Sequence, residues 1–189
     1  LVLDADHAGA HYGLGELALR RNDLPAAEER FRRVLAADRN YPGAHAKLGA
    51  VLMRRGRARR AGRQFDAEMT LCGDDRALLR SLGQLLLDAG QAGRAKSVWG
   101  RLVALDPGDA QAEHNLAVSL FLSDRLDEGI YHCRRALKLN PAYALALYNM
   151  ALAHLHKGQI LRARRYVSRA LTISPDDENI RNLSKRLGV

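Results

Sequence analysis

Apolar residues recur along the chain with a fixed spacing of 34 positions. Stepping forward by this spacing from Leu1 reaches Leu35, Met69, Val103, Leu137 and Leu171. A repeat of this length is typical of proteins built from stacked copies of one structural unit. With Ala8 as the first place of the unit, five units follow without insertion or deletion: 8–41, 42–75, 76–109, 110–143 and 144–177.

Within each unit, the pattern predicts two helices joined by a short turn. Leu116 and Leu120, for example, lie four residues apart and share one helix face. Place 8 of the unit is always small: Gly15, Gly49, Gly83, Ala117 and Ala151. Place 24 carries a residue that fills the space beside it: Phe31, Phe65, Trp99, Cys133 and Val167. The turn carries residues that tolerate left-handed or turn backbone: Asn22, Gly56, Gly90, Asp124 and Gly158. We therefore predict antiparallel helix pairs in close contact.

Residues 178–189 predict one further helix after the five units. Ile180, Leu183 and Leu187 have three- and four-residue spacing, and a Ser-Pro-Asp sequence in front of them is a helix start signal. The other face of this segment is polar, as the end of a repeat array requires. We expect a capping helix.

The unit resembles the tetratricopeptide repeat in its period, its small residues, its turn and the proline that closes its last three copies (Pro107, Pro141 and Pro175). The resemblance covers nearly the whole chain. It implies an all-α fold, a right-handed superhelical α-solenoid of antiparallel helix pairs. Residues 1–7 then correspond to the tail of a preceding, truncated repeat. We expect the chain to be a piece of a longer array.

The second unit, 42–75, departs most from the family pattern. Glu68 stands where later units carry Ala136 and Ala170, and an arginine-rich turn also breaks the pattern. We expect a locally loosened or rotated helix there. The aromatic residue that the family places at position 4 is replaced throughout, by His11, His45, Leu79, Glu113 and Leu147.

The resemblance implies that partner peptides bind to the first helix of each unit, on the concave surface of the array. The corresponding residues here are Tyr12, Glu16, Lys47, Arg80, Gln84, His114, Asn115, Tyr148 and Asn149. Asn115 and Asn149 occupy the same place in successive units. Their amides could pair with the backbone of an extended peptide, or could satisfy neighbouring groups of the array itself. Two cations of the related clamp for chaperone carboxylates are missing, so a neutral or mildly acidic peptide is the better match.

The net charge of +9 resides mainly in the second halves of the units. Of 30 Lys and Arg residues, 8 fall in the first fourteen places of the units, 19 in the remainder of the units and 3 in the capping segment. We interpret the basic groups as a solvated outer face. Few aromatic residues accompany them, so we do not expect base stacking on nucleic acid.

No catalytic, phosphate-binding or dinucleotide-binding motif is present. His7 and His11, with Asp4 and Asp6, could be a metal cluster, but a plain surface cluster is the better interpretation. Cys72 and Cys133 have no partner spacing for zinc or disulfides. We expect no enzyme activity, no cofactor and no metal. The sequence has no apolar run long enough to span a membrane and does not determine the cellular compartment.

We therefore predict a protein-interaction scaffold, with a composition that indicates a bacterial source. The first alternative is the recognition part of a larger enzyme, such as a glycosyltransferase or sulfotransferase. The second is binding of nucleic acid or an anionic membrane by the basic face. Self-association through the truncated N-terminal edge is a further expectation, because an unpaired apolar helix face tends to find a partner.

Overall fold

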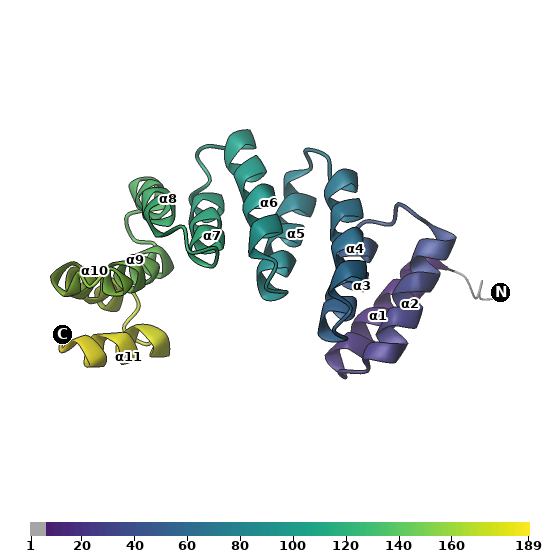
Figure 1. Cartoon of the computed structure of the whole chain (residues 1–189), viewed down its shortest axis with the longest axis horizontal. Helices are drawn as coiled ribbons and strands as arrows, with labels where there is room; N and C mark the ends of the chain where they lie inside the picture. Colours follow the sequence, from purple (N-terminus) through teal and green to yellow (C-terminus); the bar gives the residue numbers. More distant parts are fainter. Residues whose placement is uncertain (1–6) are drawn as a thin grey trace. The chain divides into compact units, whose positions relative to one another are not determined.

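The computed structural model describes residues 7–189, which form α-helices joined by short turns, with no strand among them (Figure 1). Of residues 1–7, which we assigned to the tail of a preceding repeat, the first six lie outside the described part. Self-association through that edge stays an expectation. The helices are α1 (Ala8–Arg20), α2 (Leu24–Ala37), α3 (Ala44–Arg54), α4 (Ala58–Leu71), α5 (Arg76–Asp88), α6 (Ala92–Leu105), α7 (Ala110–Phe121), α8 (Leu126–Leu139), α9 (Ala144–His156), α10 (Ile160–Ile173) and α11 (Glu178–Leu187). The predicted all-α class is confirmed.

The chain divides into two compact units, and the division falls at Gln91 and Ala92. The first unit contains α1 to α5, and the second contains α6 to α11. In the first unit α1 packs on α2 and α3 on α4. In the second, α7 packs on α8, α9 on α10, and α11 on α10. Each unit therefore contains two stacked helix pairs, while α5 and α6, the two helices of the third repeat, fall in different units. No described helix is both long enough and apolar enough to cross a membrane.

The turns within the pairs have the left-handed backbone that the sequence predicts. Their φ angles are positive at the same place in each repeat: Asn22 59°, Gly56 71°, Gly90 68°, Asp124 58° and Gly158 69°. Asparagine, aspartate and glycine adopt this conformation at the lowest cost. The turn that sets each helix pair is thus encoded locally.

Close approach of the paired helices depends on the small residue at place 8. A Cβ on Gly15 would lie 2.9 Å from the ring of Phe31, and one on Gly49 would lie 2.6 Å from that of Phe65. Both phenylalanines are fully buried. In the second unit, Ala151 belongs to the same buried cluster as Val167. Small residues therefore make room for the larger side chain of the partner helix, as predicted.

The second repeat is not loosened. α4 is a continuous helix through Glu68, whose side chain is 2% exposed. Its carboxylate accepts hydrogen bonds from the backbone N–H groups of Gly43 (2.8 Å) and Ala46 (3.0 Å), at the start of α3. The first alternative, a loosened helix, was wrong because the buried charge is satisfied by the otherwise unpaired donors of a helix N-terminus. The second, a rotated helix, stays a prediction.

The last helix, α11, packs against the preceding helix pair. Ile180, Leu183 and Leu187 join a buried cluster with residues of α9 and α10. Asp177 accepts a hydrogen bond from the N–H of Ile180 at the start of the helix, and Gly188 ends it in a left-handed conformation. The opposite face of α11, including Arg181 and Lys185, is exposed.

Candidate peptide-binding surface

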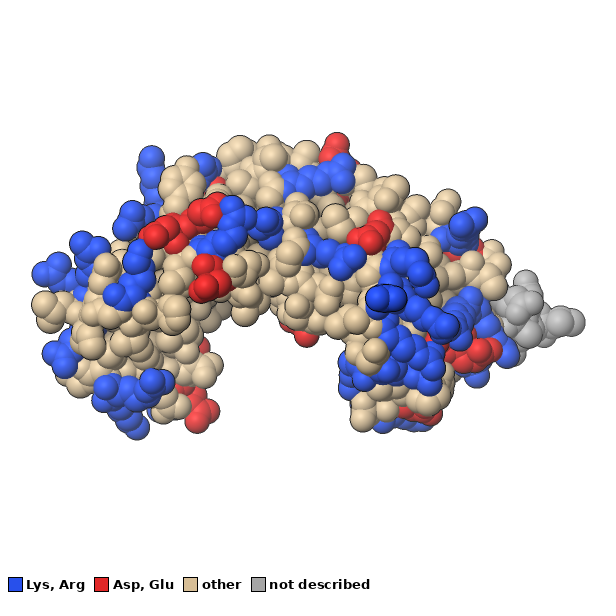
Figure 2. Space-filling view, in the orientation of Figure 1, with Lys and Arg blue, Asp and Glu red and all other residues tan. Residues whose placement is uncertain are grey.

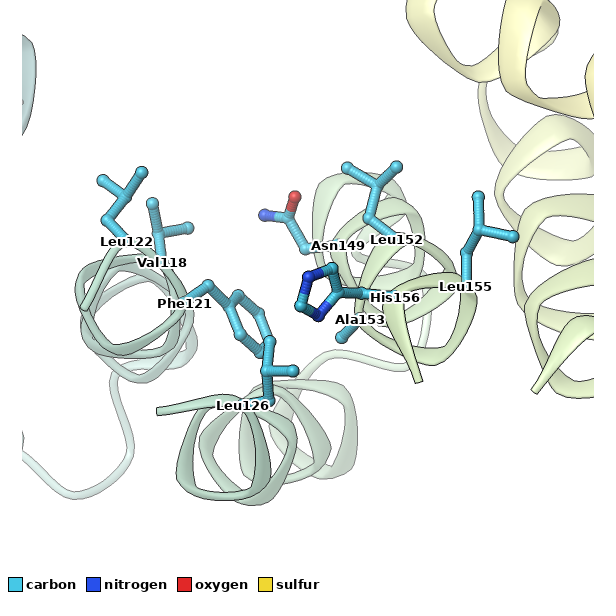
Figure 3. A pocket seen from close by; sticks show the side chains of 9 residues that line it. All are labelled: Val118, Phe121, Leu122, Leu126, Asn149, Leu152, Ala153, Leu155 and His156. Carbon is cyan, nitrogen blue, oxygen red and sulfur yellow. The ribbon is translucent and has the colours of Figure 1, made fainter. Parts of the chain in front are cut away.

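An open apolar pocket of about 480 Å³ lies in the second unit, between α7, the start of α8 and α9 (Figure 3). Figure 3 shows the rings of Phe121 and His156 between the α7 side of the pocket and its α9 side. Leu122, at the rim, is 60% exposed. The lining residues are Val118, Phe121, Leu122, Leu126, Asn149, Leu152, Ala153, Leu155 and His156. Asn149 and His156 supply the polar groups of this lining.

Helical spacing explains why these side chains converge. Val118 of α7 and Leu122, the residue directly after that helix, lie four residues apart. Asn149, Leu152 and His156 follow similar three- and four-residue steps on α9. They belong to the first helices of two successive repeats. The pocket is therefore formed between repeats.

The position of the Phe121 ring depends on Gly129 of α8, which has no side chain. A Cβ on Gly129 would lie 2.3 Å from the Phe121 ring. Such a distance is far inside van der Waals contact, so glycine is required for the ring to pack there. The ring can consequently lie across α8 and form one wall of the pocket.

Beside the pocket, His114 ties Asn149 to the preceding repeat. The Asn149 amide donates to Nε2 of His114 at 2.8 Å, and the Tyr143 hydroxyl lies 3.2 Å from Nδ1. A neutral imidazole has one donor and one acceptor nitrogen, so in this arrangement Nδ1 donates to the tyrosine oxygen. Burial lowers the pKa of His114 to about 4, which keeps the ring neutral near neutral pH. The network holds Asn149 at the pocket.

The predicted site residues of the second unit thus have different surroundings. Asn149 lines the pocket, while His114 is buried behind it at 5% exposure. Asn115 is 8% exposed and is absent from the pocket lining, and Tyr148 packs partly buried against the core of α9 to α11. Of the two proposed ladder amides, only Asn149 lies at the pocket.

In the first unit, the predicted residues pair with one another. Glu16 of α1 and Lys47 of α3 form an ion pair at 2.8 Å. Tyr12 packs against the Phe31 ring at a centroid distance of 5.6 Å and against that of Tyr41 at 5.2 Å. Burial, followed by nearby carboxylates, raises the pKa of Tyr12 to about 12, so its hydroxyl stays protonated. The cation of Lys47 is neutralised within the array.

A second, more polar groove of about 510 Å³ lies in the first unit between α1, α3 and α5. Lys47, Met53 and Asp88 are among its lining residues. Gln84 donates to Asp88 at 2.9 Å and is exposed, and Arg80 is half-buried. Neither Gln84 nor Arg80 is among the groove's lining residues.

Within residues 7–189, no group of three or more His, Cys, Asp or Glu side chains could hold a metal ion. Asp4 and Asp6, part of the cluster considered with His7 and His11, fall outside the described residues. Cys72 and Cys133 are buried and form no disulfide, and burial raises the pKa of the Cys133 thiol to about 12.

Sequence reasoning missed the apolar part of the pocket. Phe121, Leu122 and Leu155 lie at or just after the ends of the first helices, beyond the places that the family resemblance assigns to peptide contact. One feature of the sequence pointed to the pocket. Leu122 is an apolar residue in a turn, and the preceding helix already has enough apolar residues to pack on its partner. A single exposed leucine does not by itself define a pocket, because the opposite wall of the pocket comes from a neighbouring repeat.

Comparison with known proteins agrees with the repeat pattern. A tetratricopeptide repeat family model matches residues 2–44, 12–69 and 80–144, and a second such model matches residues 120–187. Two curated proteins of Arabidopsis thaliana are similar. The inactive TPR repeat-containing thioredoxin TTL3 is 31% identical over 71 residues, which is 38% of this chain and 10% of that protein. The TPR repeat-containing thioredoxin TTL4 is 30% identical over 93 residues, which is 48% of this chain and 14% of that protein.

Solved structures share the fold. MamA from Desulfovibrio magneticus is 21% identical with a TM-score of 0.67, over 90% of this chain and 97% of that one. YrrB, a TPR protein with an unusual peptide-binding site, is 21% identical with a TM-score of 0.64, over 96% and 94%. PilF of Pseudomonas aeruginosa is 18% identical with a TM-score of 0.67, over 96% and 82%. With helix pairs, left-handed turns and family matches over most of its length, the chain belongs to the tetratricopeptide repeat family.

Proposed function

We propose that the chain is a protein-interaction scaffold whose second unit binds an extended segment of a partner protein along α7 and α9. The observation that carries the proposal is the apolar pocket with Asn149 in its lining. Ligand sites are commonly apolar concavities with a few placed polar groups. The peptide-binding site of YrrB, a protein of the same fold, supports the same use of this array.

The chemistry of the pocket defines the segment it would take. A leucine, methionine or phenylalanine side chain of the partner would enter between Leu122 and Leu152, and burying such a side chain is worth about 1.5–3 kcal/mol. The Asn149 amide oxygen is not used in the contact with His114 and would accept a backbone N–H of the partner. One such hydrogen bond adds about 0.5–1.5 kcal/mol. A neutral segment with an apolar anchor fits best.

Leu122→Ser tests the pocket. Partners are first isolated by co-purification from the native cell, and the affinity of the main partner is then measured for the purified variants. We expect Leu122→Ser to weaken binding about tenfold, because its side chain would no longer contribute apolar area. Leu161→Ser is the matched control: Leu161 is 75% exposed on α10 and does not line the pocket. Equal affinity of the two variants would refute the pocket.

The asparagines are tested by the pair Asn149→Ala and Asn115→Ala, measured singly and together. The pocket geometry predicts that Asn149→Ala weakens binding and that Asn115→Ala adds little to it. An intact affinity of the double variant would eliminate the amide contact altogether. The thermal unfolding midpoint of each variant shows whether it is folded, so that a loss of affinity can be assigned to the contact and not to unfolding.

A further inference from the structure

A second pocket, of about 400 Å³, lies on the second-helix side of the second unit. It is lined by Arg134 of α8, His154 of α9, and Arg162, Arg165, Tyr166 and Arg169 of α10. No carboxylate is among the lining residues. Figure 2 shows Lys and Arg side chains gathered on the visible face of α8 and α10.

The arginines converge because of their spacing. Arg162, Arg165 and Arg169 follow one another at three and four residues on α10 and therefore share one helix face. Arg134 reaches the same space from the helix of the preceding repeat. Four guanidinium groups thus surround one concavity.

None of these four arginines forms an ion pair with a carboxylate of the described residues; Arg162 only donates to the amide oxygen of Gln159 at 3.3 Å. Nearby basic residues are neutralised. Arg135, next to Arg134, lies 2.6 Å from Glu113, and Lys157 pairs with Asp127. The pocket therefore contains positive charge that no carboxylate in the described part of the chain balances. A bound anion would reduce the repulsion between the guanidinium groups.

The back of the pocket is rigid. His154 is 2% exposed, and its Nδ1 donates to Oε1 of Gln159 at 2.7 Å. Its ring stacks on that of Tyr166 with centroids 5.3 Å apart and an interplanar angle of 7°. The arginines thus project from a fixed aromatic wall. Because one face of Tyr166 is already occupied by His154, the pocket offers little platform for stacking a base.

We propose that this pocket binds a small ligand that carries a diphosphate group. Guanidinium forks match phosphate oxygens with two parallel hydrogen bonds each, so four of them suit two adjacent phosphoryl groups. The charges converge on one concavity rather than running along the surface, which favours a compact polyanion over a nucleic-acid strand or a membrane. This site lies on other helices than the peptide surface and does not depend on it.

The test is titration of the full chain with inorganic pyrophosphate by isothermal calorimetry at 50 mM and 150 mM salt. We expect saturable binding at one site. The single variants Arg165→Gln and Arg169→Gln should each weaken this binding at least tenfold. Arg164→Gln is the matched control, since it removes the same charge from the same helix outside the pocket and should change affinity less than twofold. Thermal unfolding verifies that all three variants fold.

Further arms distinguish the source of the anion. If the affinity for adenosine diphosphate equals or exceeds that for pyrophosphate, the ligand is a nucleoside diphosphate. If pyrophosphate binds more tightly than adenosine diphosphate, the ligand is the free ion. No pyrophosphate binding at either salt would overturn the proposal, and so would equal losses in Arg164→Gln and Arg165→Gln. Tighter binding of single-stranded DNA or of anionic vesicles, lost equally in all variants, would also overturn it in favour of a diffuse basic surface.

Discussion

At the scale of single residues, place 4 of the repeat shows how a buried position accepts different chemistry. Leu79 and Leu147 fill it as apolar residues, 1% and 0% exposed. In the other three repeats a polar residue there bonds to the side chain nineteen positions later: His11 to Arg30 at 3.2 Å, His45 to Gln64 at 2.7 Å and Glu113 to His132 at 2.7 Å. Hydrogen bonding lowers the cost of placing a polar group in a buried or half-buried position, so the partner on the second helix offsets the missing apolar contact.

Gly15→Ala tests the close packing of the first helix pair. The added methyl group would lie 2.9 Å from the Phe31 ring, and we expect a net loss of about 1–2 kcal/mol in the free energy of unfolding, because overpacking exceeds the gain in helix propensity. Urea denaturation measures it. Gly13→Ala, on the same helix with no atom near the new Cβ, should instead stabilise by about 0.5–1 kcal/mol. Similar stability of the two variants would contradict this packing.

His114 predicts a pH dependence. Its folded pKa of about 4 is below the unfolded value of 6.5, so the unfolded state binds the proton more readily. The stability contributed by the neutral ring is complete above pH 6.5 and is lost as the pH falls toward 4. The shift corresponds to about 3 kcal/mol in total, of which about 2 kcal/mol is lost by pH 5.

The measurement is chemical denaturation at pH 7, 6 and 5 of the unmodified chain and of His114→Gln. We expect the variant to lose less stability over this range than the unmodified chain. His156→Gln, which changes an exposed histidine, should retain the full pH dependence. If the three proteins show the same slope, His114 is not the group that titrates.

At the scale of helices, buried carboxylates join different elements, both between repeats and within one repeat. Glu28 of α2 is 1% exposed and forms ion pairs with Arg32 at 2.6 Å, with Arg57 at 2.9 Å and with Arg55. The last two belong to the turn of the next repeat. Glu68 of α4 in turn holds the start of α3. Charges that break the family pattern thus stabilise contacts between helices.

Glu68→Ala tests this role. Alanine is the residue that the last two repeats carry at this place, yet here it would leave the N–H groups of Gly43 and Ala46 without their acceptor. Leaving buried donors unpaired costs about 1–3 kcal/mol each, so we expect a loss of at least about 2 kcal/mol in urea denaturation. Glu29→Ala, which removes an exposed pair with Arg33, should cost about 0–1 kcal/mol. Equal costs would show that Glu68 is not a helix cap.

At the scale of the molecule, the second unit presents two chemically different surfaces. The first helices α7 and α9 enclose an apolar pocket, and the second helices α8 and α10 enclose a basic one. The high positive charge predicted for an outer, solvated face is thus partly organised into a pocket. A scaffold that binds a partner on one side and a small anion on the other could engage both at once, because the two linings share no residue.

The sequence by itself determined the helix pairs, their turns, the small residues between paired helices and the capping helix. The helix pairs, turns and small residues could be predicted because each depends on contacts inside one repeat, which the period of 34 residues reproduces. The capping helix could be predicted from its own apolar spacing and its start signal. It also placed His114 and Asn149 near the proposed site through the family resemblance.

Only the tertiary structure decided which polar contacts close a repeat and what forms between repeats. Within the second repeat, Glu68 looked like a defect until the N-terminus of α3 was seen to bind it, 22 and 25 residues away in sequence. The walls of the apolar pocket come from α7 and α9, and the arginines of the basic pocket from α8 and α10. Such sites depend on how one helix pair packs against the next, because that packing determines which side chains of different repeats converge.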